Sequence, residues 1–295
     1  MFVGGVIQLS IPHILKHLEE SIEIESKARA AEPREFHHNP SSASFKVGAE
    51  TYGACLRRLY YRASETPVTN TSGFSSKLTA KFGQSIHDWI FTTLKGHEHL
   101  HVESEVPGKV LVNPLTKEIS YRMDGLLTHK GERGGVEVKT KGGYKLQSMV
   151  KSHGPDWADF AQIVTYFEIE RELMWYVLVY VARDTGFHAE YHIYRDYNDG
   201  EKIKYRGIVP QETHPKELPV TFQQVKDRWQ LLEKYIVDKV VPPRDYKVAL
   251  DKEGKPTKER TRNYVKIKSD VNCMYCPWLN HCWSQPGAKE DASIS

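Results

Sequence analysis

Two acidic residues and a lysine form the first candidate site in the sequence. Asp124 lies late in the segment EISYRMDGLLT, and Glu137 and Lys139 lie in GVEVKTK. Both segments read as strands joined by the turn HKGERG, and strand side chains two residues apart share one face. A hairpin therefore can bring Asp124 beside Glu137 and Lys139. Such a set suits Mg²⁺, which prefers oxygen ligands and keeps water that a lysine can orient or deprotonate. A solvated sheet face with a Glu–Lys pair is the alternative.

The cysteines form a second candidate site. Cys273, Cys276 and Cys282 have the spacing C-x2-C-x5-C, and the fourth cysteine of the chain, Cys55, lies far upstream. Two cysteines separated by two residues can hold one metal centre from a tight turn, and a third closes the loop. Either Cys55 or His281 can supply the fourth ligand. The spacing alone leaves Zn²⁺ and an iron–sulfur cluster open.

Helices and strands must position these residues. Helices are expected at about 11–26, at 54–63, from 78 onward, at about 157–171 and at about 221–239. Strands are expected at 102–112, 118–128, 135–141, 174–182 and 187–195.

Three of these elements carry further expectations about their packing. The spacing of Phe82, Ile86, Trp89 and Ile90 predicts a core-facing stripe on the helix that begins near 78. The continuous apolar run at 174–182 predicts a strand buried on both faces. The alternating segment that follows it resembles an edge strand.

Length, composition and charge limit the class of protein. The chain has 295 residues, 39% of them hydrophobic, and 41 basic against 38 acidic side chains. These values are typical of one large globular domain or two small ones rather than a disordered protein. No run approaches the about 20 apolar residues that a membrane span needs, and the amino terminus lacks the features of a secretory signal. We therefore expect a cytoplasmic protein without a membrane partner.

Basic and aromatic residues suggest a nucleic-acid partner. The helix at 54–63 carries Arg57, Arg58, Tyr60 and Arg62, and arginine–tyrosine sets bind phosphates and stack on unpaired bases. A solvated helix is the alternative. Residues 244–268 hold nine Lys or Arg against four acids, which suits either a mobile loop or a segment that contacts DNA. The histidines His97, His99 and His101 are interpreted as a loop entering a strand, because no sulfur ligand or clear carboxylate partner accompanies them.

Four segments together resemble a known family. GQSIHDWI, YRMDGLL, GVEVKTK and AQIVTYFEI resemble, in order, the motifs of RecB-like nucleases of the PD-(D/E)XK superfamily. The resemblance implies an α/β fold with a restriction-endonuclease-like core, in which helices flank a mixed central sheet in the order αβββαβ.

The same resemblance assigns roles to individual residues. It implies that Mg²⁺ or Mn²⁺ is bound by His87, Asp124, Glu137 and the carbonyl group of Val138. Asp124, Glu137 and Lys139 would be catalytic, with Lys139 serving the attacking water, and Gln162 and Tyr166 would lie near DNA. Without the resemblance, His87 is interpreted as a partly buried histidine. Gln162 and Tyr166 are then interpreted as part of an ordinary polar helix face.

The position of the cysteines on either side of these motifs resembles the iron–sulfur nucleases of the superfamily, namely AddB-type domains and CRISPR-associated exonucleases of RecB type. This implies a 4Fe–4S cluster on Cys55, Cys273, Cys276 and Cys282 that joins the ends of the domain. The expected organisation is an amino-terminal extension (1–45), a nuclease domain with the iron–sulfur subdomain (46–285) and a flexible tail (286–295).

The expected function is a metal-dependent DNA exonuclease that acts on single-stranded ends, in DNA repair, recombination or CRISPR adaptation. The alternative is a non-catalytic or partner-dependent DNA-binding module of a larger helicase–nuclease or integration complex.

Overall fold

The computed structural model describes residues 20–25, 27, 35–98, 100–152, 154–196, 202–250, 256–257, 259–262, 265–268 and 270–285. The expected helix at 11–26 lies largely outside these residues. So do His99, several residues of the basic stretch beyond 250, and the expected tail 286–295. Among the described helices, none combines the length and the apolar character that crossing a membrane requires.

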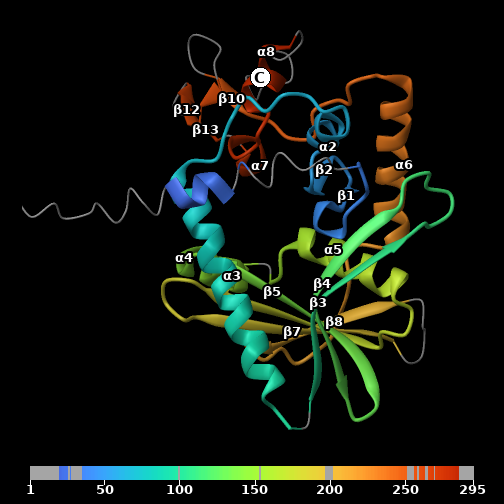
Figure 1. Ribbon diagram of the computed structural model, residues 1–295. Coiled ribbons are helices and arrows are strands. Elements are labelled where there is room, and N and C mark those ends of the chain that lie inside the picture. Colours follow the sequence, from blue (N-terminus) through green and yellow to red (C-terminus); the bar gives the residue numbers. More distant parts are fainter. Residues whose placement is uncertain are drawn as a thin grey trace, which may run out of the picture.

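A mixed seven-stranded sheet forms the body of the molecule (Figure 1). In spatial order its strands are β3 (His101–Val110), β4 (Ile119–His129), β5 (Glu132–Lys141), β6 (Trp175–Ala182), β7 (His188–Arg195), β8 (Ile203–Val209) and β9 (Lys216–Glu217). Only the β5–β6 pair is parallel among these strands. A parallel pair needs a crossover connection, and here it contains α4 (Gly143–Ser152) and α5 (Trp157–Ile169). The predicted mixed sheet flanked by helices is confirmed.

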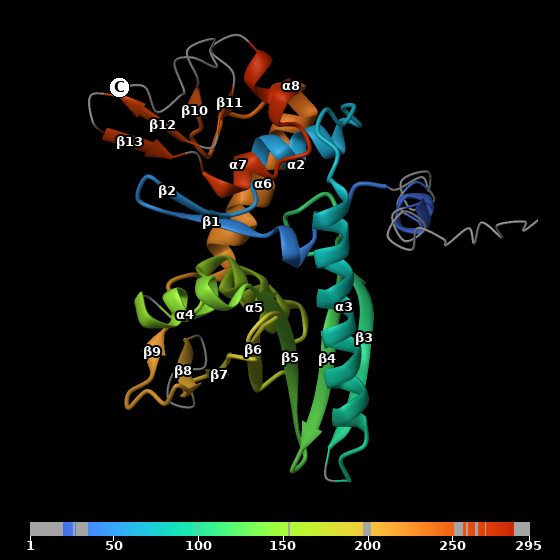
Figure 2. The same ribbon diagram turned by 90° about the vertical axis from the view of Figure 1, so that its left-hand side faces the viewer.

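Helix α3 (Phe74–Lys95) covers one face of the sheet and runs along β3 and β4 (Figure 2). The predicted core-facing stripe is wrong at two positions, because Phe82 is 57% and Trp89 67% exposed. The helix instead approaches the sheet through Gly83 and Phe91, both of which are buried. Gly83 has no side chain, so hydrophobic periodicity cannot register it. The face that contains Gly83 and Phe91 also contains His87, because positions four residues apart lie on one side of a helix.

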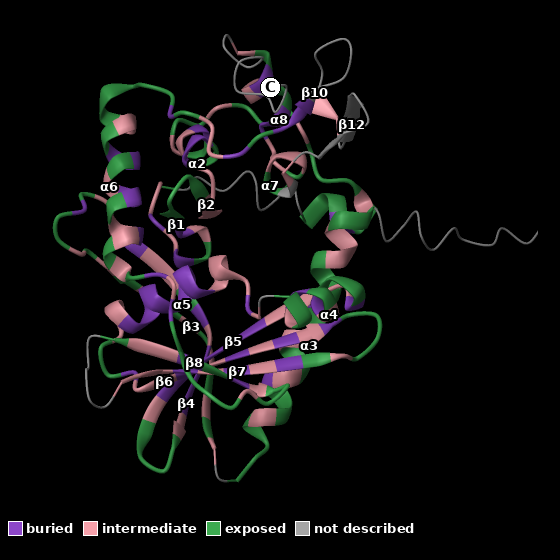
Figure 3. Cartoon of the chain, turned by 180° about the vertical axis from the view of Figure 1, so that it is seen from behind, coloured by how far each residue is buried: buried purple, intermediate pink, exposed green. Residues whose placement is uncertain are grey.

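The other face of the sheet carries the main core, visible as buried segments in α5 and the strands (Figure 3). Phe160, Ile163 and Phe167 of α5 are buried in this core. The prediction that the strand at 174–182 is buried on both faces is wrong. In β6, fully buried residues such as Leu178 alternate with partly buried ones, because α5 lies against one face and the opposite face is only partly covered.

The predicted edge position of the strand at 187–195 is also wrong. This strand, β7, lies inside the sheet because β8 pairs with it on the far side from β6. The residues of β8 were not predicted as a strand.

A second group of elements lies beyond the hairpin of β1 (Ser44–Val47) and β2 (Glu50–Gly53), on the side away from the large sheet (Figure 2). It comprises α2 (Leu56–Ala63), β10 (Ala249–Leu250), β11 (Pro256–Thr257), β12 (Glu259–Arg262), β13 (Val265–Lys268), α7 (Val271–Met274) and α8 (Leu279–Ser284). Segments far apart in the sequence meet here. The backbone amide of Thr69 donates to the carbonyl oxygen of Pro277 at 3.0 Å, and the Trp278 indole donates to that of Thr66 at 2.8 Å.

Helix α6 (Phe222–Asp238) joins the two groups. It begins with a capping box between Thr221 and Gln224, which satisfies the free amide groups at the helix start. Trp229 of this helix is buried in the main core. Leu232 packs against Leu56 and Leu59 of α2. A short 3-10 helix, η1 (Pro40–Ser42), precedes β1 in the chain and contacts α5.

Candidate active site

The site begins where β4 and β5 separate. The pairing of these two strands ends at Gly125 opposite Val136, one residue before Asp124 and Glu137 would face each other. Beyond that point the Asp124 carboxylate takes the place of a backbone partner, and its Oδ2 accepts a hydrogen bond from the amide of Val138 at 2.9 Å. The divergence therefore places two carboxylates close together at the end of a regular ladder.

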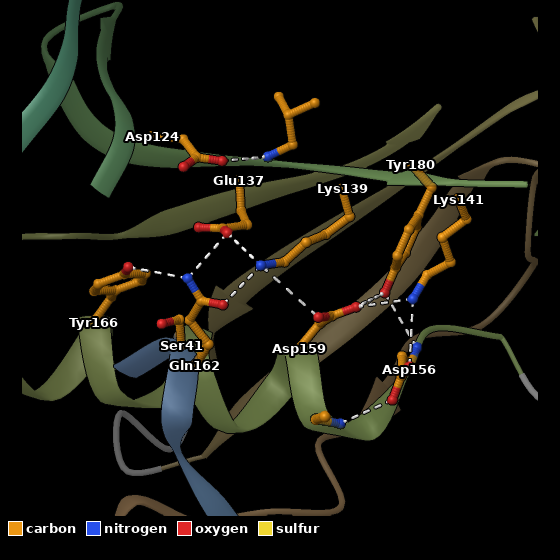
Figure 4. Close-up of polar contacts among 12 residues, drawn as sticks. Ser41, Asp124, Glu137, Lys139, Lys141, Asp156, Asp159, Gln162, Tyr166 and Tyr180 are labelled. Atoms are coloured by element: carbon orange, nitrogen blue, oxygen red, sulfur yellow. Dashed lines mark hydrogen bonds and ion pairs between the residues drawn. The ribbon is translucent and has the colours of Figure 1, made fainter. Parts of the chain in front are cut away.

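Glu137, Lys139 and Gln162 form one hydrogen-bonded triangle (Figure 4). Lys139 Nζ lies 2.6 Å from Glu137 Oε1, as expected for residues two apart on a strand. Gln162 of α5 donates through Nε2 to Glu137 Oε1 at 2.9 Å and accepts from Lys139 through Oε1 at 2.8 Å. Its amide also donates to the hydroxyl of Tyr166 at 3.0 Å, which in turn donates to the Arg122 carbonyl oxygen at 3.2 Å. Gln162 thus fixes both the acid and the lysine.

The electrostatics of the triangle favour binding of a further cation. Burial raises the pKa of Glu137 to about 7, against the opposing effect of Lys139. Burial also raises the pKa of Asp124 to about 6, although the Val138 amide opposes it. Burial by itself would lower the pKa of Lys139, but the attraction of Glu137 and Asp159 outweighs it, and the net direction is upward. Lys139 is therefore protonated, and its single positive charge offsets only part of the negative charge that Glu137 and Asp124 would carry when ionised.

The residues present fit a divalent metal in their chemistry. Glu137 Oε2 is buried and has no hydrogen-bond partner among the described residues, and such an oxygen is costly to leave unsatisfied. Mg²⁺ is commonly held by one or two carboxylates with water completing its shell. His87 Nδ1 lies 3.5 Å from Asp124 Oδ2, and burial lowers the pKa of this imidazole, which favours the neutral form that ligates metals. Among the described residues, however, no three His, Cys, Asp or Glu side chains are grouped so as to hold a metal ion.

Sequence reasoning missed Asp159. Its Oδ1 lies 3.9 Å from Lys139 Nζ, and its Oδ2 accepts from the Tyr180 hydroxyl at 2.7 Å and lies 3.8 Å from Lys141 Nζ. A signal was available, because Asp159 lies three residues before Gln162 and so on the same side of the helix. Lys141 likewise follows Lys139 by two residues on β5. The acid and the second lysine extend the polar network away from Glu137.

A cavity of about 900 Å³ connects this network with the second group of elements. Lys139, Asp159 and Gln162 line it, and so do Arg58 and Arg62 of α2. We call it the active-site cavity. Its volume lies in the usual range for ligand sites.

Two other residues predicted on α2 to contact DNA lie elsewhere. Arg57 is buried, and its Nε donates to the Pro242 carbonyl oxygen at 2.6 Å. Tyr60 packs with the buried residues between α2 and α6.

All four cysteines line a single small cavity between α2 and the α7–α8 segment, which we call the cysteine cavity. Burial raises the pKa of the Cys55 thiol to about 11, and it also raises the pKa of Cys273 and Cys276. Arg57 Nη1 lies 3.8 Å from Cys282 Sγ, at hydrogen-bond distance for sulfur.

The alternative ligand His281 does not line the cysteine cavity, and its ring packs edge-on against Tyr61 at 4.9 Å. The structure places the distant Cys55 at the same cavity as the C-x2-C-x5-C segment, although among the described residues no three cysteines are grouped closely enough to hold a metal ion.

Comparisons with known proteins give a limited result. No family model matches the chain, and no curated protein matches its sequence. Among solved structures it is similar to the crystal structure of SSO0001, with a TM-score of 0.49 and 14% identity over 92% of this chain and 96% of that one. It is also similar to LHK-Exo in complex with dAMP, with a TM-score of 0.41 and 14% identity over 62% of this chain and 78% of that one. Neither likeness assigns an activity to this chain.

Proposed function

We propose that this chain is a metal-dependent DNA exonuclease of the RecB-like PD-(D/E)XK type. The observation that carries the proposal is the hydrogen-bonded triangle of Glu137, Lys139 and Gln162. Asp124 is held beside it by the Val138 amide where β4 and β5 diverge, and Lys139 and Gln162 line the active-site cavity. The order α3, three antiparallel strands, α5 and then β6 parallel to β5 provides the framework for this set. Carboxylates beside a fixed ammonium suit hydrolysis of a phosphodiester, in which negative charge develops on the phosphate oxygens.

Each residue has a role that follows from its contacts. Asp124 and Glu137 would hold Mg²⁺ or Mn²⁺, with His87 and the Val138 carbonyl group as the further candidates. A bound ion would supply Lewis acidity toward the phosphate and lower the pKa of water. Lys139 remains protonated beside Glu137, so it acts by orienting water and by countering charge on phosphate rather than by accepting a proton. Gln162 holds both side chains in position.

We further propose that the substrate is a single DNA strand entering from an end. The active-site cavity is bordered by Arg58 and Arg62, which suit a sugar–phosphate backbone. DNA repair, recombination or CRISPR adaptation, with partner proteins, are the settings in which such trimming is needed.

We also propose that the cysteine cavity holds a 4Fe–4S cluster. In a cluster each thiolate binds a different iron, so the four sulfurs stand further apart than around one Zn²⁺. Four half-buried cysteines line one cavity and would supply the four thiolates of this donor set, and the thiols would have to move and lose their protons on binding. Anaerobically purified protein should be brown and contain iron and sulfide. If the purified protein is instead colourless and contains zinc, the cluster proposal is wrong and the cysteines form a zinc site.

Digestion of end-labelled single strands tests the nuclease proposal. The wild type should shorten the strand with Mg²⁺ or Mn²⁺ and stop when EDTA is added. Asp124→Asn should lose digestion by about 10³-fold or more while retaining binding by fluorescence anisotropy. Glu172→Gln, on an exposed side chain of a surface ion pair, serves as the matched control. Undiminished digestion by Asp124→Asn would refute the site. Binding without digestion by the wild type would instead support the DNA-binding module.

A further inference from the structure

A second cavity, of about 600 Å³, adjoins the active-site cavity. Its lining residues come from β2, α4 and the start of α5, and they are Tyr52, Tyr144, Lys145, Ser148, Met149, Asp156 and Trp157. We call it the aromatic pocket. Tyr52, Lys145 and Asp156 line both spaces, so the two border each other. A ligand in the active-site cavity can therefore extend a planar group into the aromatic pocket.

One wall of the aromatic pocket is fixed. The rings of Tyr52 and Trp157 lie 4.8 Å apart between centroids, and Tyr52 also stacks on Phe45 at 5.3 Å. Phe45 is fully buried. Trp157 is the first residue of α5, whose start is held by the Asp156 side chain accepting from the Ala158 amide at 3.2 Å. The wall thus stands on the same helix that carries Gln162.

Tyr144 at the rim has a different character. It is 87% exposed, and within the described part of the chain its side chain has no hydrogen bond or ring contact. The backbone beside it is nevertheless held in position, because the amide group of the preceding Gly143 donates a hydrogen bond to Asp184 Oδ1 at 2.7 Å. A Cβ on Gly143 would lie only 2.6 Å from Thr185 Oγ1, so a larger residue here would force the Thr185 side chain or α4 to shift. The position therefore presents an aromatic ring without a protein partner on an anchored helix end.

The charges around the two spaces favour an anionic ligand. Arg58, Lys145 and Lys247 line the active-site cavity, and none of them forms an ion pair with a carboxylate of the described residues. The acids of the same cavity are mostly paired. Asp156 lies 3.4 Å from Lys141, for example, and Asp245 lies 2.7 Å from Arg228. Cationic groups without partners thus remain for phosphate.

We propose that the aromatic pocket binds one unpaired nucleobase of the substrate strand, stacked against Tyr144 and the Tyr52–Trp157 wall, with the adjoining phosphate beside Lys145. The inference rests on the proposed function for the presence of a strand. Stacking on aromatic rings tolerates every base, because each has a π-face. The pocket would therefore set the position of the strand relative to Glu137 and Lys139 without reading its sequence.

Fluorescence of 2-aminopurine tests the proposal without cleavage. Single strands carrying this base at successive positions are bound in EDTA, and binding is followed separately by anisotropy of an end label. In the wild type, one position should be quenched several-fold more than its neighbours. Tyr144→Ala should restore fluorescence at that position alone, whereas Tyr144→Phe, which keeps the ring, should retain the quenching. Val237→Ala, at an exposed residue of α6, is the control.

An abasic scan provides the second measurement. Removing the base at the quenched position should weaken binding to the wild type by about 5- to 100-fold, as expected for one stacked base. The same removal should have little further effect on Tyr144→Ala. The proposal for the aromatic pocket is wrong if the strand binds but no position is preferentially quenched. It is also wrong if the quenching is unchanged in Tyr144→Ala. Either result leaves the nuclease proposal intact. Absence of any strand binding would overturn both.

Discussion

Glu233 on α6 holds two distant parts of the chain, and replacing its carboxylate should destabilise the fold. It is buried, and its oxygens accept hydrogen bonds from His38 Nε2 at 2.8 Å and from the amides of Thr116 and Lys117 at 2.9 Å each. His38 precedes η1, and the two amides belong to the connection between β3 and β4. Glu233→Gln keeps one carbonyl oxygen as an acceptor, but its amide group points a donor at other donors.

The expected loss follows from these contacts. About two hydrogen bonds to a charged group disappear, each worth roughly 1.5–3 kcal/mol, and local relaxation recovers part of that sum. We expect the free energy of unfolding to fall by about 3 kcal/mol at pH 7.5. Urea denaturation measures it, with Glu172→Gln as an exposed carboxylate control that should change it by less than about 0.5 kcal/mol. A loss below about 1 kcal/mol for Glu233→Gln would refute the reasoning.

The pH dependence gives an independent check. Burial lowers the pKa of His38, whose Nδ1 is buried and has no partner among the described residues. The pKa of Glu233 is also lowered, because its hydrogen bonds to Thr116, His38 and Lys117 outweigh burial. Both groups bind fewer protons in the folded state, so the stability they contribute is present above their unfolded pKa values and is lost as the pH falls. Stability should decline below about pH 6.5 through His38 and again below about 4.5 through Glu233. Glu233→Gln should remove the second decline.

The remaining predictions concern the two sites. Asp159→Asn should lower the digestion rate by about 10-fold by leaving Lys139 with one carboxylate neighbour, and an unchanged rate would remove Asp159 from the network. Cys55→Ala should lower the iron content and the melting temperature together, because the linkage between distant segments is lost; a full iron complement in this variant would exclude Cys55 as a ligand. Gly143→Ala should destabilise the fold by about 1–3 kcal/mol in urea denaturation, since its Cβ meets Thr185, and a neutral result would mean that α4 can shift.

The local parts of the site were predictable from the sequence. Strand alternation alone put Glu137 and Lys139 on one face, and the short turn between two strand patterns placed Asp124 in the neighbouring strand. Helical spacing placed Gln162 and Tyr166 on one side of a helix, and their hydrogen bond follows. These relations depend only on the side-chain periodicity within one helix, strand or hairpin, and this periodicity can be read from the sequence.

Contacts between elements were decided by the tertiary structure. Periodicity could not show that Gln162 bridges Glu137 and Lys139, that Asp159 adjoins the same lysine, or that α3 faces the sheet through a glycine. The interior position of β7 likewise depends on β8, a strand that the sequence pattern did not reveal.

The cysteines illustrate the same division. Their number and the C-x2-C-x5-C spacing come from the sequence, whereas the approach of Cys55 to Cys282 depends on how α2 packs against α6 and the α7–α8 segment. Sequence spacing determines which groups a single element can present. The packing of several elements, driven by burial of their apolar faces, determines which of those groups meet.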